Sequence, residues 1–578
     1  MKTEWNLKKQ YRGLNDLALE KDIQKIERAY KVFEKKYRGI TSYLEKAHAL
    51  KITIEEYEKL YVLPKPLSYL FLVKAIDINN KTIDAKIANT QQRIVRAANS
   101  VTFFRLNLGQ IPKKKQKFFL ENTELIPYNY FLTQAFEAGK HELSEQETTL
   151  LNELSLPAGE MWVDLTERLQ GERTIEFQGK EIPLSAAQGL LSTLNKKERS
   201  LLWSKIRSEF KADASAAEAE LNALYTTKAI VDRRRNYKEP YEETLTDFET
   251  TKKELNALRL AVKENLSLSR EFYEYKRDTL RLKTLTYADR NVAHGSLNTT
   301  FSFKESIEIL RNVLKKSHPL FLQIFDEMLR EQRIDVYPRK GKMSGAFCSG
   351  NVEFPTFVLL NHVNTLDSLS TLAHEVGHAI HTELAKGNSP LYQGYSTATA
   401  EFASTFFEEL LFSELAPSLS TREQKILLHN RVNRDISTIF RQMAFFEFEY
   451  ALHSEVRIKG YVPKERIAEL LNQKSSEYLG QAVVLEKDDG YFFVPLSHIR
   501  RFFYVYSYAY GGLLSRLVSK RALEKPELFE KVTELLSSGS FSAPKNLFKG
   551  IGMNTEKKET FTDALAIVRA DFEHLKDK

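Results

Sequence analysis

Apolar side chains recur at three- and four-residue spacing over much of this 578-residue chain. That spacing places them on one face of an α-helix, where they pack against a common core. The stretches with this pattern are residues 16–37 up to Gly39, residues 52–63 up to Pro64, residues 67–106 with a break at Asn79 and Asn80, residues 196–235 and residues 248–282. The chain is therefore predicted to be mainly α.

Two short regions change to β-type patterns. In TIEFQGKEIP, residues 174–183, apolar and polar side chains alternate around Gly179, which predicts a hairpin. A second hairpin is predicted from the β-prone runs at 346–348 and 356–360, directly before another helix. Since the chain exceeds the size of a single core, we expect a helical N-terminal domain over residues 1–190 and a second domain over residues 191–578.

The composition excludes several classes of protein. No apolar run approaches the roughly 20 residues of a membrane span, and no apolar stretch follows the early lysines, so a cytoplasmic location without a membrane partner is expected. The 85 Lys and Arg residues are scattered among 77 Asp and Glu residues, and a net charge of +8 is weak evidence for a nucleic-acid partner. With Cys348 as the single cysteine, any metal must be bound by histidine and carboxylate.

The segment NTLDSLSTLAHEVGHAIHTEL has the features of one helix. Asn364 is a plausible cap, and leucines follow at positions 366, 369 and 372. Because His374 and His378 are one turn apart, both imidazoles can reach the same ion. Glu375 is rotated by about 100° from His374, so it can contact a water at the metal without being a ligand. These residues predict two zinc ligands and a general base.

A peptidase zinc needs a third protein ligand, and the sequence AIHTEL after His378 lacks the third histidine of the extended motif. Glu401 is our candidate, in the first turns of the predicted helix TATAEFASTFFEELL. The rivals are Glu383, which lies too far along the first helix, and Glu408 or Glu409. Glu408 shares the face of Glu401 two turns later and is expected to be exposed or to support a ligand by a hydrogen bond.

A tyrosine-rich segment, SHIRRFFYVYSYAYGG, is the candidate source of hydrogen-bond donors to a reacting carbonyl. Its even-numbered tyrosines cannot all face one side of a helix, so some are expected to point into a cavity. The alternative is a core stripe of tyrosines on a buried helix. By spacing alone, His498 and Tyr504 are only candidates.

HEVGH followed by AEFAST, preceded by GAFCSG and trailed by HIRRFFYVYSYAYG, resembles the oligoendopeptidase F family of thimet-oligopeptidase-like zinc peptidases. The resemblance spans nearly the whole chain and implies two helical lobes around a deep channel for oligopeptides, with one zinc ion per chain. It implies zinc binding by His374, His378 and Glu401 and catalysis by Glu375.

The resemblance also implies further substrate contacts. The strand at Gly345, Ala346, Phe347 and Cys348 would lie along the substrate backbone, and His498 and Tyr504, together with Tyr508, would hydrogen-bond the scissile carbonyl. Many family members carry an aspartate in the loop where this chain reads QGYSTATAE, which puts the contacts of that loop in doubt.

The expected activity is hydrolysis of internal peptide bonds by a zinc-activated water whose proton Glu375 removes. One alternative is an exopeptidase that removes C-terminal dipeptides. In that case Arg500 or Arg501 would hold the substrate carboxylate, although the simpler interpretation is that each is a surface or salt-bridged arginine. A non-catalytic peptide-binding protein is a further alternative, against which an intact Glu375 argues. The sequence leaves the oligomeric state open.

Overall fold

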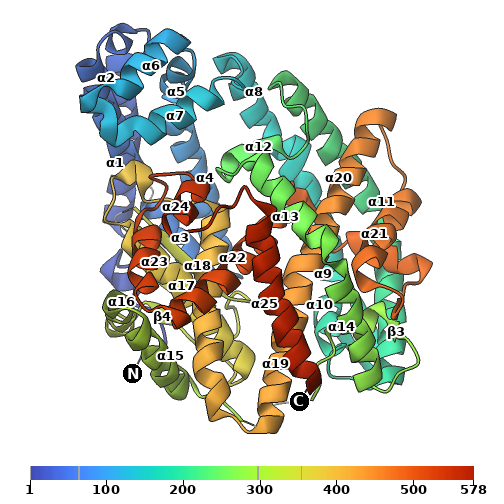
Figure 1. Cartoon of the computed structure of the whole chain (residues 1–578). Helices are drawn as coiled ribbons and strands as arrows, with labels where there is room; N and C mark the ends of the chain where they lie inside the picture. Colours follow the sequence, from blue (N-terminus) through green and yellow to red (C-terminus); the bar gives the residue numbers. More distant parts are fainter. Residues whose placement is uncertain (1, 63–64, 296–298, 353, 578) are drawn as a thin grey trace. The chain divides into compact units, whose positions relative to one another are not determined.

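The computed structural model describes residues 2–62, 65–295, 299–352 and 354–577 (Figure 1). The chain divides into two compact units, each built from three separate stretches. Unit 1 comprises Met1–Thr149, Thr299–Leu415 and Val518–Met553, and unit 2 comprises Leu150–Asn298, Ala416–Leu517 and Asn554–Lys578. The units thus interleave along the sequence, and the domain division predicted at residues 190 and 191 stays a prediction.

Unit 1 is mostly helical. Its helices are α1 (Leu17–Tyr37), α2 (Ala47–Glu58), α3 (Lys65–Ile76), α4 (Lys81–Asn99), α5 (Thr102–Gly109), α6 (Lys113–Glu121), α7 (Asn129–Ala138), α15 (Phe303–Ser317), α16 (Pro319–Arg330), α17 (Leu366–Ala385), α18 (Thr397–Leu415), α23 (Leu528–Ser537) and α24 (Pro544–Gly550). Two of the boundaries between the units fall within helices, namely α8 (Glu145–Ser155) and α22 (Tyr506–Glu524).

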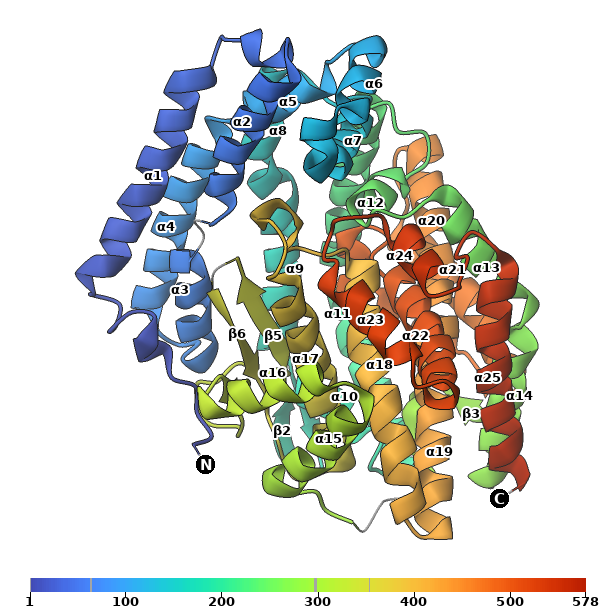
Figure 2. The same ribbon diagram turned by 60° about the vertical axis from the view of Figure 1, so that its left-hand side comes forward.

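A three-stranded sheet of unit 1 lies beside α17, as Figure 2 shows. Its order is β4 (Ile334–Asp335), β6 (Phe354–Leu359), β5 (Phe347–Asn351), with β4 parallel and β5 antiparallel to β6. Apolar side chains of the N-terminal segment and α3, among them Trp5 and Leu70, form one core cluster with Phe357 of β6. The mainly α prediction, with a small sheet next to the helix that carries HEVGH, is confirmed.

Unit 2 is also built mainly from helices. They are α9 (Met161–Glu172), α10 (Leu184–Leu190), α11 (Lys196–Arg234), α12 (Glu242–Asp247), α13 (Lys252–Glu264), α14 (Leu266–Thr279), α19 (Thr421–Asp435), α20 (Gln442–Lys459), α21 (Lys464–Leu479) and α25 (Lys558–Asp577). Strands β1 (Thr174–Phe177) and β2 (Lys180–Pro183) pair antiparallel, and β3 (Leu285–Thr286) pairs with β7 (Val483–Val484) in parallel.

Most of the predicted elements are present, with small corrections. Both hairpins form, and Asn80 caps α4 after the predicted break. The stretch at residues 248–282 is two helices, because α13 ends at Glu264 and α14 begins at Leu266. The predicted stop at Pro64 falls outside the described residues, and α2 itself ends at Glu58.

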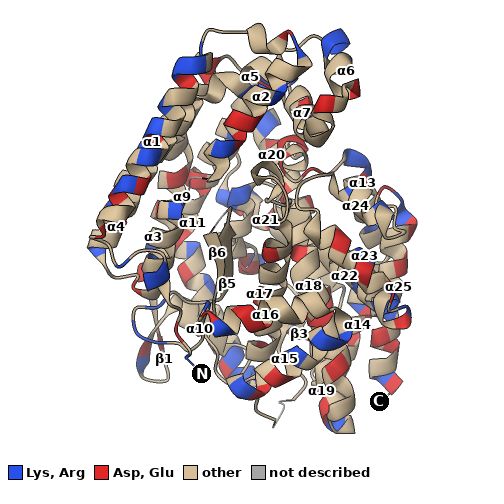
Figure 3. Ribbon diagram, turned by 90° about the vertical axis from the view of Figure 1, so that its left-hand side faces the viewer, with Lys and Arg blue, Asp and Glu red and all other residues tan. Residues whose placement is uncertain are grey.

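Charge is mixed along the helix surfaces. Basic and acidic residues alternate along α1 (Figure 3), and Arg93 of α4 forms ion pairs with Glu20 and Glu27 of α1. Within the described part of the chain, no helix is long and apolar enough to cross a membrane.

Candidate active site

Helix α17 begins one residue later than its sequence indicates. Thr365 is the N-cap, and its hydroxyl accepts a hydrogen bond from the Ser368 amide at 3.2 Å. The predicted cap, Asn364, adopts a left-handed φ of 60° and precedes the helix. Leu369 and Leu372 are fully buried, so this face of α17 is anchored in the core of unit 1.

Three side chains of α17 and α18 form a possible metal centre. Among the described residues, His374, His378 and Glu401 are the one group of three or more such side chains whose ligand atoms all lie within 4.8 Å of one another. The two histidines belong to one turn of α17, and Glu401 is in the first turns of α18, as predicted. Zinc binds histidine nitrogen and carboxylate oxygen at roughly 2.0–2.2 Å, and ligand atoms within 4.8 Å of one another are compatible with one shared ion.

Gly377 of the HEVGH motif allows α18 to approach α17. A Cβ atom at this position would lie 2.8 Å from the Cα of Ser404 and 2.9 Å from a ring carbon of Phe407. Since the first of these atoms is backbone, a larger residue would push the helices apart. The glycine therefore fixes the distance from which Glu401 reaches the histidines.

Glu408 supports His374 from behind. Its Oε1 lies 2.7 Å from His374 Nδ1, and its Oε2 accepts a hydrogen bond from the Ser370 hydroxyl at 2.8 Å. This contact leaves the other ring nitrogen of His374 for a ligand, which is the usual arrangement behind a metal-binding histidine. Of the two roles expected for Glu408, the structure has the supporting one, and the carboxylate is buried.

The protonation of the two histidines differs. Burial disfavours the imidazolium of His374, but the hydrogen bond and charge of Glu408 outweigh it and raise the pKa to about 9. For His378, burial and the charge of His374 hold the pKa well below its ordinary value. Burial, reinforced by Glu408, raises the pKa of Glu401. The carboxylates thus favour positive charge at this place, which a bound cation would supply instead of the His374 proton.

Glu375 lies on the same helix and is only 7% exposed. Burial raises its pKa to about 7, with His374 opposing and the carboxylates of Glu401 and Glu408 adding to the shift. A carboxylate that titrates near neutral pH is suited to accept and return a proton during hydrolysis. Glu383, the rival on α17, instead contacts Arg333 and Lys386 and accepts a hydrogen bond from the Thr356 amide.

The predicted substrate strand is β5, at the edge of the sheet among the described strands. Gly345, with φ 77°, and Ala346 precede it, and Phe347 packs its ring against Trp5 and Phe71. Burial and the nearby Glu375 raise the pKa of Cys348 well above its ordinary value, so this thiol stays protonated.

A contact between α17 and the loop before α18 has no counterpart in our sequence predictions. The Tyr395 ring stacks on His381 with 3.7 Å between ring centroids, and its hydroxyl lies 2.7 Å from Thr382 Oγ1. Burial lowers the pKa of His381 to about 3, so this histidine is neutral. The spacing of His381, three residues after His378, is the only sequence signal that points to it.

The three residues predicted to contact the substrate carbonyl form a cluster in unit 2. Tyr508 Oη lies 3.4 Å from His498 Nε2, and the Tyr504 ring centroid is 5.3 Å from that of Tyr508 and 6.3 Å from that of His498. All three side chains are half-buried. Burial and the neighbouring Arg441 and Arg501 hold the pKa of His498 below its ordinary value.

The chain reaches Tyr504 through a strained turn. Phe502 has φ 35° and ψ 103°, and Phe503 has φ 57°. Such conformations cost about 1–3 kcal/mol for each non-glycine residue. Phe503 is fully buried, with its ring against Phe446 and His453, and this packing offsets part of that cost.

The other tyrosines of the segment are core residues, as the alternative interpretation holds. Tyr506 Oη is 2.6 Å from Thr250 Oγ1, and Tyr510 donates to Glu254 at 2.8 Å. Arg500 is also structural, since its guanidinium donates to both carboxylate oxygens of Glu220 at 2.6 and 2.8 Å. Arg501 is exposed.

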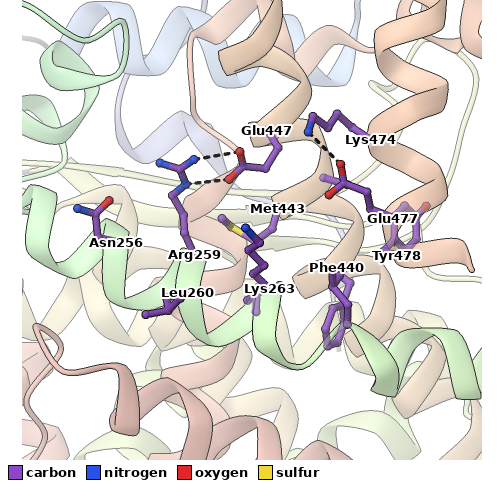
Figure 4. A pocket seen from close by; sticks show the side chains of 13 residues that line it. Asn256, Arg259, Leu260, Lys263, Phe440, Met443, Glu447, Lys474, Glu477 and Tyr478 are labelled. Atoms are coloured by element: carbon purple, nitrogen blue, oxygen red, sulfur yellow. Dashed lines mark hydrogen bonds and ion pairs between the residues drawn. The ribbon is translucent and has the colours of Figure 1, made fainter.

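A separate pocket of about 580 Å³ lies in unit 2, between α13, α20 and α21 (Figure 4). Its lining residues include none of the predicted site residues. Arg259 is paired with Glu447 at 2.7 and 3.0 Å, and Lys474 with Glu477 at 2.9 Å. Four of the charges on its walls are therefore already compensated.

Two histidines and a carboxylate that can share one ion, with a second carboxylate beside them, are the arrangement of metal-dependent hydrolases. The model of peptidase family M3 matches residues 190–567, and a second model, described as oligopeptidase F, matches residues 107–171. The chain therefore belongs to peptidase family M3, and it is a peptidase.

Individual relatives agree with this assignment. An oligoendopeptidase F homolog of Borreliella burgdorferi is 25% identical over 574 residues, which cover 97% of this chain and 96% of the relative. Oligopeptidase PepF of Bacillus subtilis is 25% identical over 83% of this chain and 74% of its own length. The solved structure of a putative peptidase from Chlamydophila abortus shares the fold, with a TM-score of 0.82, 19% identity and coverage of 100% and 98%. The resemblance to the oligoendopeptidase F family is confirmed.

Proposed function

We propose that this peptidase is a zinc-dependent oligoendopeptidase that hydrolyses internal bonds of short, unstructured peptides. The observation that carries the proposal is the group of His374, His378 and Glu401 with Glu375 on the same helix. The printed names of the relatives, oligoendopeptidase F and oligopeptidase, support peptides as the substrate class.

The donor set fits one zinc ion. His374, His378 and Glu401 would hold it, and three protein ligands leave a coordination position open, as catalytic zinc sites require. When bound, zinc would lower the pKa of a water molecule and polarise the substrate carbonyl. Glu408 keeps His374 oriented, through the 2.7 Å contact with its Nδ1.

Glu375 is proposed as the proton carrier. Its carboxylate would accept a proton from the attacking water and deliver it to the leaving amine, so that the acid and base roles alternate on one group. Burial raises its pKa, which favours uptake of the proton by the carboxylate.

Edge strand β5 is proposed to hold the substrate backbone. An edge strand presents backbone N–H and C=O groups to which an extended peptide can add as a further strand. Folded proteins offer few such extended segments, which supports a preference for unstructured peptides. The contacts of Gly345, Ala346, Phe347 and Cys348 with substrate are proposed on this basis.

His498 and Tyr504 are proposed to donate hydrogen bonds to the oxygen of the reacting carbonyl, with Tyr508 beside them. This proposal rests on the resemblance to the family. The half-buried cluster of the three side chains in unit 2 supports it, because it gathers two phenol groups and an imidazole in one place.

The proposal is tested with an internally quenched, end-blocked peptide of about ten residues, beside a folded protein, with and without a chelator. We expect internal cleavage of the peptide but not of the folded protein. Cleavage should be lost with the chelator and recovered when zinc is restored. Absence of cleavage despite stoichiometric zinc would refute the proposal.

The same assay separates the exopeptidase alternative, which would act on free but not on blocked C-termini. That activity needs a cationic group to hold the substrate carboxylate. Arg500 is 9% exposed and bound to Glu220, which weighs against it in this role.

A further inference from the structure

One peptide group of unit 2, the one that joins Phe502 to Phe503, is held at both of its polar atoms. The hydroxyl of Thr244 donates to the Phe502 carbonyl oxygen at 2.9 Å, and the Phe503 amide donates to Glu449 Oε1 at 2.7 Å. Because the peptide group is planar, hydrogen bonds at its two ends fix the orientation of the whole plane.

These bonds hold a backbone conformation that phenylalanine rarely adopts. In the part of the chain that the structure describes, Phe502 and Phe503 are the only two adjacent non-glycine residues with positive φ. Strained conformations persist only where surrounding contacts over-determine them, and they concentrate at functional sites. The turn is therefore a feature that the fold maintains at a cost.

Glu449 makes few other polar contacts that would account for a carboxyl group at this position. The side chain is fully buried on α20, and its Oε2 has no hydrogen-bond partner among the described residues. The nearest ring nitrogen, His453 Nε2, is 3.8 Å from Oε1, too far for a hydrogen bond. A buried carboxyl group with one unsatisfied oxygen destabilises a core, so an apolar residue at this position would give a more stable protein.

The turn leads directly into the half-buried cluster. Tyr504 follows Phe503, and its ring centroid lies 5.3 Å from that of Tyr508 at the start of α22. A rotation of the peptide group between Phe502 and Phe503 would turn the Tyr504 side chain out of this arrangement.

We propose that Glu449 is a positioning residue for peptide hydrolysis. It orients the peptide group between Phe502 and Phe503 and thereby fixes the position of the Tyr504 phenol. The inference rests on the proposed function, in which Tyr504 contacts the reacting carbonyl. Thr244 performs the same task at the other end of the peptide group.

Two substitutions distinguish the effect of the hydrogen-bond acceptor of Glu449 from the effect of its side-chain shape. Glu449→Met removes the acceptor at similar length, whereas Glu449→Gln keeps an oxygen for the Phe503 amide. With the quenched peptide, we expect Glu449→Met to lower kcat at least about tenfold, because a displacement of about 1 Å in an active site can cost up to about 100-fold. KM and zinc content should stay near wild type, and Glu449→Gln should restore most of kcat.

Coupling to Tyr504 is the decisive measurement. Tyr504→Phe alone should lower kcat by about 100-fold, as the loss of one oxyanion donor does. Since Glu449 acts through Tyr504, adding Glu449→Met to Tyr504→Phe should change kcat little further. Multiplication of the two separate effects would overturn the inference, because it would show independent roles.

A matched control is Thr250→Val, which removes another buried hydrogen bond of unit 2, the 2.6 Å contact with Tyr506. It should lower the melting temperature without lowering kcat. If Glu449→Met behaves like this control, Glu449 is merely structural and the inference is wrong. Should Glu449→Met fail to fold, Thr244→Val tests the other end of the same peptide group by the same kinetic comparison.

Failure of the proposed function is recognised separately. Zinc-dependent cleavage that survives Tyr504→Phe unchanged would refute the roles of both Tyr504 and Glu449 and leave the zinc oligoendopeptidase intact. Loss of kcat in Tyr504→Phe but not in Glu449→Met would refute the role of Glu449 alone.

Discussion

The helix pair of α17 and α18 and the turn at Phe502 and Phe503 present functional side chains in opposite ways. In the helix pair, regular backbone sets the positions, because His374 and His378 are one turn apart and Gly377 lets α18 approach. In the turn, strained backbone sets the position of Tyr504, and distant residues such as Glu449 hold that backbone.

The difference has a physical basis. A helix satisfies its own backbone hydrogen bonds, so the spacing of side chains along one helix, such as His374 and His378, follows from local sequence. A left-handed turn of phenylalanines has no such local source of stability and depends on tertiary contacts. The metal ligands are therefore placed by regular helices, whereas Tyr504 reaches its position through a turn that tertiary contacts maintain.

The largest effect is expected for Glu375→Gln, in the helix pair. It should lower kcat by about 10²–10⁴-fold, because a general base contributes roughly that factor, while the zinc content stays unchanged. Kinetics with the quenched peptide and metal analysis of the same sample check this. Asp367→Asn, which also replaces a carboxylate by an amide but at an exposed position on α17, is the control. Equal losses of metal and activity would contradict the assignment of Glu375 as a non-ligand.

On the other side of the comparison, Arg500→Met should reduce the free energy of unfolding by about 3–5 kcal/mol, since it leaves Glu220 buried without its partner. Denaturant unfolding measures this. The ratio of cleavage between free and end-blocked peptides should not change. A selective loss of activity on free C-termini would instead support a carboxylate-binding role for Arg500.

Glu408→Gln should weaken zinc binding by about 10–100-fold, the range typical of residues that orient a metal-bound histidine. Competition with a chromophoric chelator gives the affinity. As a comparison, Ser370→Ala removes only the hydrogen bond that steadies Glu408 and should have a smaller effect. An unchanged affinity in Glu408→Gln would show that helix geometry alone orients His374.

Gly377→Ala should destabilise the chain by about 1–3 kcal/mol through overpacking against Ser404, and it should weaken zinc binding by displacing Glu401. Thermal unfolding and zinc titration measure the two effects. Gly387→Ala is the control, because its added Cβ would meet no atom nearer than 3.7 Å. Wild-type zinc affinity in Gly377→Ala would show that the spacing of the helices does not control the ligand group.

The smallest effect is expected for Thr365→Ala, which removes the N-cap of α17 and should cost about 1 kcal/mol. Asn364→Gly, at the neighbouring position with φ 60°, should change stability by only a few tenths of a kcal/mol. Chemical denaturation of both variants compares the two positions. The reverse order would restore Asn364 as the cap.

Sequence reasoning succeeded where structure is local. Both hairpins, the HEVGH helix and the place of Glu401 in the next helix follow from short-range patterns, and the structure has them all. The cap differed by one residue because Asn364 and Thr365 are both good capping residues and only the backbone conformation distinguishes them.

Features that depend on contacts distant in sequence could not be predicted. Nothing near Phe503 indicates that Glu449 accepts its amide hydrogen, and Tyr395 stacks on His381 across a loop. Glu408 was recognised as sharing a face with Glu401, but its role became definite only with the contact to His374. The interleaved division into two units also has no local signal in the sequence.

That interleaving has a consequence for synthesis on the ribosome. The last stretch of unit 1, Val518–Met553, emerges only after most of unit 2 has been translated. It includes Ser537, whose carbonyl accepts a hydrogen bond from the Asn388 side chain at 2.6 Å. Asn388 lies shortly after the end of α17. The nascent chain therefore carries its HEVGH helix without this contact until translation is nearly complete, and premature termination before Val518 would release a polypeptide in which neither unit can finish folding.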